Sequence, residues 1–142
     1  MHLQRNNEKL NTEEATENMK NSKYLFAEHF KKVFEGKQLF LNPRLTIIDL
    51  AQEMGTNRTY ISDYLNHVLG TTFFNFVNQR RLVYAEHLLK ETNDSLDNIS
   101  SLSGFNSPST FRRAFSKKHG CTPGQYRAVN EKQTGKRKKR KR

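Results

Sequence analysis

One pattern occurs twice in this chain, about fifty residues apart, and this duplication limits the fold more than any other feature. The paired landmarks are Leu50 with Ile99, Gly55 with Gly104, Leu65 with Phe115, Gly70 with Gly120 and Phe76 with Tyr126. Each copy consists of a short amphipathic stretch, a glycine turn and a second amphipathic stretch with a polar outer face, which is the sequence form of a helix-turn-helix. The chain is therefore predicted to contain two helix-turn-helix units.

The first unit covers about residues 46–69. Thr46 and Asp49 resemble a capping box, with aspartate in the place of the usual glutamate, and Gly55 ends the helix that they open. Asn57 is expected to cap the second helix. The inward stripe of that helix is predicted to be Ile61, Tyr64, Leu65 and Val68. Its outward residues are Arg58, Thr59, Ser62, Asp63 and Asn66.

The second unit covers about residues 95–118. Ser95 is expected to cap its first helix, whose buried residues are predicted to be Leu96, Ile99 and Leu102. Ser107 and Pro108 start the second helix, because serine accepts from free backbone N–H groups and proline has no N–H to leave unpaired. The outward residues of this helix are Ser109, Arg112, Arg113 and Ser116, with Lys117 and Lys118 near its far end.

The remaining segments complete an all-α prediction with about seven helices. A helix is expected over 24–34, ended by Gly36, and another over about 73–91, which is long enough to link the two units at roughly 27 Å. Thr122, Pro123 and Gln125 predict a last helix over about 123–129. Residues 1–22 are expected to be a polar linker or flexible N-terminus, residues 23–130 the folded domain, and residues 131–142 a basic disordered tail.

The positive charge is unevenly distributed. The formal net charge of +11 divides into 0 for residues 1–23, +4 for 24–130 and +7 for 131–142. A nucleic acid partner fits both basic parts, and the tail from Lys136 to Arg142 is expected to add affinity that does not depend on base sequence. The single Cys121 and the lack of a signal segment or a long apolar run favour a reducing cytoplasm and no membrane partner. No metal or cofactor is expected, since His119 and Cys121 are a lone pair of candidate ligands.

A set of residues in the second unit resembles the signature of the DNA-binding domain of AraC/XylS-family bacterial transcription regulators. The matching positions are Gly104-Phe105, Ser109, Phe111, Arg113, Phe115, Lys117-Lys118, Gly120, Thr122-Pro123 and Tyr126-Arg127, together with Arg81-Leu82, Ala85 and Leu88-Leu89 in the linker. The resemblance covers about Tyr24 to Ala128. It implies two subdomains joined by a long helix, each placing its second helix in a major groove on one side of the duplex.

Two positions depart from the family pattern. Ser100 stands where the family usually has alanine; a serine there can bond back to its own helix, so only a modest change is expected. Asp63 stands where related proteins often carry a basic residue that contacts bases. An aspartate there can accept from a cytosine amino group or repel a misplaced phosphate. The first subdomain is therefore expected to attract DNA less than the second.

Residue chemistry assigns the candidate contacts to duplex DNA. Arginine can donate twice to guanine, whereas lysines and groups at helix starts favour phosphate. The predicted base-reading residues are Arg58, Thr59, Ser62, Asp63, Asn106, Ser109, Arg112 and Arg113. The predicted phosphate contacts are Asn57, Asn66, Ser107, Lys117 and Lys118.

The resemblance implies a transcription regulator, more often an activator, that recruits RNA polymerase and has no catalytic activity. It also implies a bacterial cytoplasmic, nucleoid-associated protein that can dimerise through a domain outside this chain. The sequence leaves open whether the chain is a fragment of a longer sensor-regulator or a small single-domain regulator. A non-specific architectural protein is the main alternative. An enzyme that transfers a methyl group to Cys121 is a weaker one, because only His119 could activate the thiol.

Overall fold

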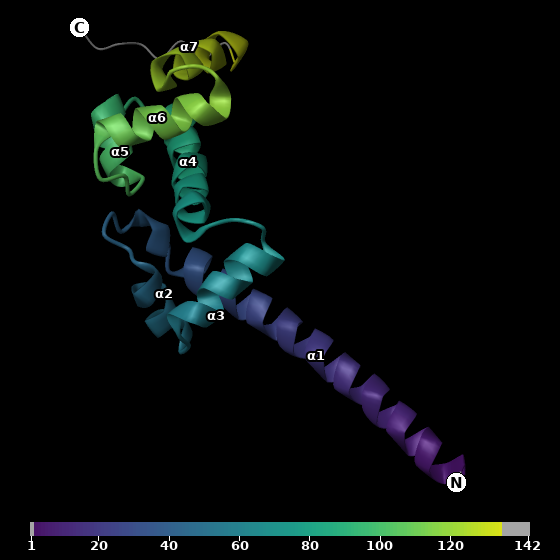
Figure 1. Ribbon diagram of the computed structural model, residues 1–142. Helices are drawn as coiled ribbons and strands as arrows, with labels where there is room; N and C mark the ends of the chain where they lie inside the picture. The colour runs from purple at the N-terminus through teal and green to yellow at the C-terminus, as the bar shows by residue number, and fades with distance from the viewer. Residues whose placement is uncertain (1, 135–142) are drawn as a thin grey trace, which may run out of the picture. The chain divides into compact units, whose positions relative to one another are not determined.

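The computed structural model describes residues 2–134, and the side chains of residues 11–133. Its α-helices are α1 (His2–Gly36), α2 (Ile47–Met54), α3 (Arg58–Asp63), α4 (Phe73–Glu91), α5 (Leu96–Leu102), α6 (Pro108–His119) and α7 (Pro123–Thr134) (Figure 1). A 3₁₀ turn, η1 (Leu39–Leu41), precedes α2, and a π-helical turn, η2 (Tyr64–Val68), continues α3. The predicted fold, all-α with seven helices and two helix-turn-helix units joined by a long helix, is thus confirmed for the described residues.

Helix α1 belongs to a compact unit of its own, which ends at Lys37. Phe26, Phe30 and Phe34 recur every fourth residue along it, and the rings of Phe30 and Phe34 stack with their centroids 5.8 Å apart. The helix ends at Gly36, as predicted. It begins at His2, however, where the sequence predicts a flexible polar segment over residues 1–22. The physical reason is that no glycine or proline interrupts the chain before Gly36, while glutamate, lysine and alanine favour a helix.

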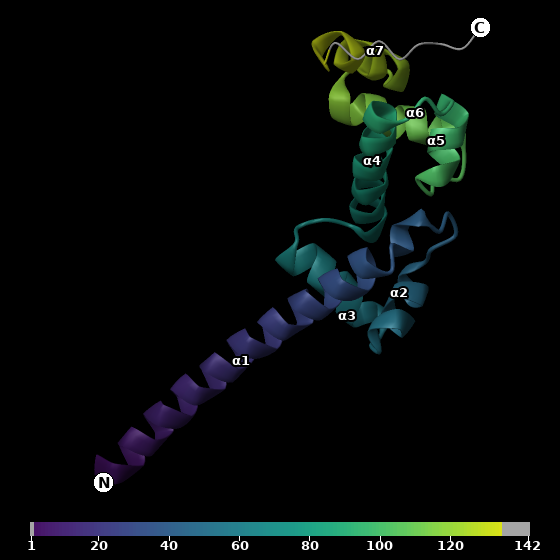
Figure 2. The ribbon, with the colours of Figure 1, turned by 180° about the vertical axis from the view of Figure 1, so that it is seen from behind.

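The second compact unit begins at Gln38 and contains both helix-turn-helix units. Helices α5, α6 and α7 gather at one end of α4, and α3 leads into its other end (Figures 1 and 2). Helix α7 continues to Thr134, beyond the predicted end near residue 129. The predicted disordered tail, residues 131–142, therefore begins inside α7, and its part from residue 135 on lies outside the described residues.

A single apolar cluster holds the second helix-turn-helix unit on α4. Its buried members are Leu82, Ala85 and Leu89 of α4, Ile99 of α5, Phe105 of the turn, and Phe111 and Phe115 of α6. The rings of Phe111 and Phe115 pack edge to face at 5.8 Å, and Phe115 and Tyr126 do so at 5.2 Å. Because interlocked aromatic rings leave little freedom of rotation, this cluster fixes the direction of α6 relative to α4.

Two predicted core residues are in fact exposed. Val68 is 59% exposed because η2 is a π-helical turn, which rotates the following positions away from the α-helical face. Leu102 is 46% exposed because the buried face of α5 runs through Ile99, Ser100 and Ser103. These lie three, four and seven residues after Leu96, whereas Leu102 is six residues after it and falls off that face.

Candidate nucleic-acid interface

Local hydrogen bonds define both helix-turn-helix units, and the sequence predicts them correctly. The hydroxyl of Thr46 accepts from the N–H of Asp49 at 3.1 Å, and the Asp49 carboxylate accepts from the N–H of Thr46 at 3.0 Å. The predicted caps of the later helices are also present, at Asn57, Ser95, Ser107 and Thr122. The turn glycines Gly55 and Gly104 have φ angles of 71° and 89°, in the left-handed region that favours glycine. Both second helices therefore start at defined positions.

The predicted contacts of the first unit lie on one exposed polar surface of α3 and η2. Arg58, Thr59 and Asp63 are exposed, and Ser62 is half-buried. The Asn57 side chain accepts from the N–H of Tyr60 at 2.9 Å, so only its amide NH₂ can reach a phosphate. Asn66 donates to the hydroxyl of Ser62 at 3.4 Å. Arg58 and Asp63 leave this surface formally neutral.

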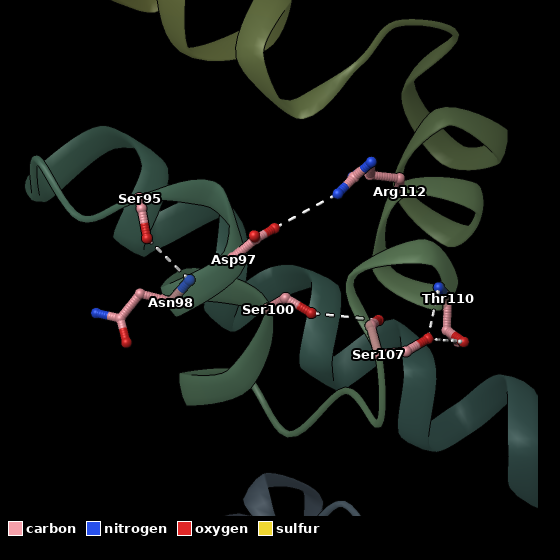
Figure 3. A network of polar contacts seen from close by, with 7 residues as sticks. All are labelled: Ser95, Asp97, Asn98, Ser100, Ser107, Thr110 and Arg112. Atoms are coloured by element: carbon pink, nitrogen blue, oxygen red, sulfur yellow. Dashed lines mark hydrogen bonds and ion pairs between the residues drawn. The ribbon is translucent and has the colours of Figure 1, made fainter.

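The second unit has a polar network across its turn (Figure 3). The Ser107 hydroxyl accepts from the N–H of Thr110 at 3.2 Å and lies 2.9 Å from the Thr110 hydroxyl. Ser100 donates to the carbonyl of Ser107 at 3.3 Å, across the turn, instead of bonding back to its own helix as a serine there could. The reason is tertiary: the turn brings the Ser107 carbonyl onto the buried face of α5. A serine at position 100 thus ties α5 to the start of α6.

Arg112 and Arg113, the arginines predicted to read bases, have different surroundings. Arg112 is paired with Asp97 of α5 at 3.4 Å, and both side chains are more than half exposed (Figure 3). A pair this exposed is worth at most about 1 kcal/mol, so a guanine can replace the carboxylate. Arg113 makes no ion pair within the described part of the chain, and neither does Lys117. Sequence reasoning did not identify Asp97, because nothing in the linear pattern places it beside α6.

Arg113 and Lys117 line a groove between α6 and the first half of α4. The groove has a volume of about 660 Å³ and also exposes the side-chain amides of Asn75 and Gln79. None of the residues that line it is acidic. Lys117 and the amide donors of this groove are suited to a phosphate, whereas the Arg113 guanidinium can donate either to a phosphate or to a guanine.

Lys118, a predicted phosphate contact, is held by a carboxylate of the linker helix. Its Nζ lies 2.7 Å from Oε1 of Glu86, and Nε2 of His119 lies 2.6 Å from the same oxygen. Burial acts to raise the pKa of Glu86, but the hydrogen bonds from Lys118 and His119 outweigh it and hold that pKa below its ordinary value. Lys118 therefore stabilises the docking of α6 on α4, and a phosphate would compete with Glu86 for it.

Two further arginines are engaged with backbone carbonyls and were not predicted to have a structural role. Arg127 of α7 donates to the carbonyls of Leu89, Thr92 and Asp94 at 3.2, 3.3 and 2.7 Å, which ties α7 to the end of α4. Arg81 of α4 donates to the carbonyls of Phe40 and Asn42. Their partners are 33 to 41 residues away in sequence, which no local pattern reveals.

The part of the chain that the structure describes shows no group of three or more potential metal ligands. Among the same residues, no helix has the length and apolar character to cross a bilayer. Cys121 is a free thiol, half-buried, that packs against the apolar cluster of the second unit. That environment is typical of a small core residue.

The profile of a protein family described as a helix-turn-helix domain matches residues 50–128, which is more than half of the chain and includes most of the first unit and all of the second. The chain belongs to the AraC/XylS-type helix-turn-helix family. This family comprises DNA-binding transcription regulators and not enzymes. Its members share the two-unit arrangement described above.

Relatives in this family include an uncharacterised HTH-type transcriptional regulator, YisR, of Bacillus subtilis, which is 31% identical over 86 residues. The melibiose operon regulatory protein of Escherichia coli is 31% identical over 87 residues. Each alignment covers 61% of this chain but only 30% and 29% of the relative, respectively. The chain thus spans less than a third of the length of these proteins.

Solved structures of AraC-type domains have the same fold. A transcriptional regulator of Chromobacterium violaceum with an AraC-type DNA-binding domain is 26% identical, with a TM-score of 0.62 over 73% of this chain and 96% of that one. The DNA-binding domain of AdpA, solved with a target DNA, has a TM-score of 0.68 at 22% identity and covers 78% of this chain and 96% of that chain. The second similarity concerns the fold alone.

Proposed function

We propose that this AraC-type domain recognises a specific DNA sequence by placing α3 and α6 in two successive major grooves on one side of the duplex. The observation that supports this most directly is the pair of capped, outward-facing helices within one compact unit, joined by the 19-residue α4. A helix of that length spans about 28 Å. Successive major grooves on one face are about 34–36 Å apart, which α4 and its flanking turns can bridge.

The two helices have unequal roles in this proposal. α6 provides the stronger attraction, because Ser107–Lys118 contains four basic and no acidic residues. Arg112 and Arg113 are proposed to contact guanine, with Asn106 and Ser109 beside them. α3 is neutral, so it selects bases without adding much affinity, through Arg58, Thr59, Ser62 and Asp63. The proposed phosphate contacts are Asn57, Asn66, Ser107, Lys117 and, in competition with Glu86, Lys118.

The proposed biological role is regulation of transcription, and specifically its activation. A relative that is 32% identical over 85 residues is described as the virulence regulon transcriptional activator VirF of Yersinia enterocolitica, and the alignment covers 31% of its length. By the same resemblance, we propose contact with RNA polymerase in the bacterial cytoplasm. Dimerisation through a domain outside this chain belongs to the same proposal.

The test is selection of bound duplexes from a random library at about 150 mM salt, where non-specific attraction is already weakened. Two short motifs about one helical turn apart are expected. A single motif would mean that one subdomain alone recognises bases, and no enrichment would favour a non-specific architectural protein. Arg113→Ala should relax the preference at one position at a cost of about 1–3 kcal/mol. Lys132→Ala, which removes one exposed charge at the end of α7, is the control and should leave every preference unchanged.

A further inference from the structure

Arg81 is a charged residue buried in the middle of α4, with an exposed fraction of only 8%. Its Nε donates to the carbonyl of Phe40 at 2.7 Å and its Nη2 to the carbonyl of Asn42 at 2.9 Å. Its Nη1 donates to the side chain of Asn78, one turn earlier on α4, at 3.3 Å. Burying a guanidinium is costly unless its donors are satisfied, and here all three nitrogens have partners. Arg81 therefore holds residues 40–42 firmly against the linker helix.

The same residues also touch the second helix-turn-helix unit at its turn. A Cβ atom added to Gly104 would overlap the carbonyl oxygen of Phe40 and lie 2.9 Å from Cα of Leu41. On the other side, the ring of Phe40 packs edge to face on Tyr84 of α4 at 6.1 Å. Residues 40–42 thus lie between α4 and the turn of the second unit, with no space for a side chain at position 104.

A short, hydrogen-bonded path leads from Asn42 to the first helix-turn-helix unit. The carbonyl of Asn42 accepts from the N–H of Leu45 at 3.2 Å, and its side chain accepts from the N–H of Arg44 at 3.0 Å. The next residue, Thr46, caps α2. The first unit is therefore held where the chain enters it, in addition to its exit at Thr72, which caps α4.

We propose that Arg81, residues 40–42 and Gly104 form a clasp that fixes the first unit relative to the second and thereby selects the spacing of the two half-sites on DNA. This inference rests on the two-groove binding proposed above. Without the clasp, α4 alone would join the units, and residues 69–72 would be a hinge. One base pair inserted between half-sites moves one of them by about 3.4 Å and rotates it by about 34°. If the two units are fixed relative to each other, the protein should bind a site with the changed spacing more weakly. If the units are hinged, both helices can still reach their half-sites.

Arg127 provides a matched control for Arg81. It too donates to three oxygens, but all of them are carbonyls at and beyond the end of α4, next to the second unit. Arg127→Met should therefore weaken the fold without releasing the first unit. Arg81→Lys is the milder companion of Arg81→Met, since it keeps the charge but loses the planar fork of donors.

The first measurement needs no DNA. Spin labels are placed at exposed positions of α2 and α5 through Gln52→Cys and Ser101→Cys, in a Cys121→Ser background, and their distance distribution is recorded by pulsed electron resonance. The unchanged clasp should give a narrow distribution, which Arg127→Met preserves. Arg81→Met should broaden it and Arg81→Lys should broaden it less. An equally narrow distribution in both Arg81 variants, or equal broadening by Arg127→Met, would overturn the clasp.

The second measurement compares binding to the duplex selected by the wild-type protein with binding to duplexes one base pair longer or shorter between the half-sites. The preference of the wild type for its own spacing should fall by about fivefold or more in Arg81→Met. Binding to an isolated half-site should stay unchanged. Broadened distances with an unchanged spacing preference would overturn the role of the clasp in site selection. Selection of only one half-site by the wild type would instead contradict two-groove binding, and the spin-label distances would still decide whether the clasp exists.

Discussion

Gly104→Ala offers a direct measure of how closely the chain approaches the turn of the second unit. Gly104 has a φ of 89°, and an added Cβ would overlap the backbone at Phe40 and Leu41. Holding alanine at positive φ costs about 1–2 kcal/mol. Overlap with a backbone that is itself fixed by Arg81 adds about 1–3 kcal/mol. The substitution should therefore lower the free energy of unfolding by about 2–5 kcal/mol.

Gly120→Ala is the control for this substitution. Gly120 has a φ of 67°, and a Cβ there meets nothing within 4 Å, so alanine should cost only the backbone strain of about 1–2 kcal/mol. Replacing glycine by alanine also lowers the conformational entropy of the unfolded chain, which stabilises the folded state. This effect is the same in both variants and cancels in the comparison. Urea unfolding followed by far-UV circular dichroism should place the midpoint of Gly104→Ala about 1 M below that of Gly120→Ala. Equal midpoints would refute the close approach.

Three further outcomes are expected. Asp63→Ala should change the selected base at one position of the DNA site, whereas tighter binding to an unchanged site would leave aspartate only a repulsive role. Glu86 has a lowered pKa in the folded protein, so its contribution to stability is present above its unfolded pKa and is lost as the pH falls through the folded value. Urea midpoints of the wild type should thus drop more steeply between about pH 5 and pH 3 than those of Glu86→Gln, and parallel curves would contradict this. Thr46→Ala removes the capping box of α2 and should cost about 1 kcal/mol in the same unfolding assay, with no effect meaning that α2 is held by packing alone.

The helix boundaries could be predicted because they depend on neighbouring residues. The caps at Thr46, Asn57, Ser95 and Ser107 each act within three residues, and the sequence shows them directly. The exposed polar face of each second helix follows from the same local periodicity. The helix caps and the outward polar faces, which occur in both copies, are sufficient to predict a fold with two helix-turn-helix units.

Structure and sequence-based expectation differ where the hydrogen-bond partner is distant in sequence or the helix is irregular. The sequence allows Ser100 a bond within its own helix, whereas its partner in the structure is the Ser107 carbonyl across the turn. The family pattern includes Arg81, but the sequence does not show which carbonyls Arg81 binds or which cations Glu86 pairs with, because these partners lie 32 to 41 positions away. Val68 is expected in the inward stripe but is exposed, because no sequence rule marks the π-helical turn in which it lies. The partners and burial of such side chains depend on tertiary contacts, which a local sequence pattern does not reveal.

The π-helical turn η2 also limits how far the two halves of this molecule can be exchanged. The segment from the cap to the closing glycine has the same length in both copies, since Asn57 and Gly70 are 13 positions apart, and so are Ser107 and Gly120. Yet α6 is α-helical through His119, whereas the other helix changes its winding after Asp63. The paired positions Leu65 and Phe115, which follow Asp63 and Arg113, are both fully buried, so the inward faces of the two helices still correspond there. From Tyr64 on, however, the backbone of the first copy is π-helical, so outward residues transplanted from α6 would keep their α-helical spacing only up to Asp63.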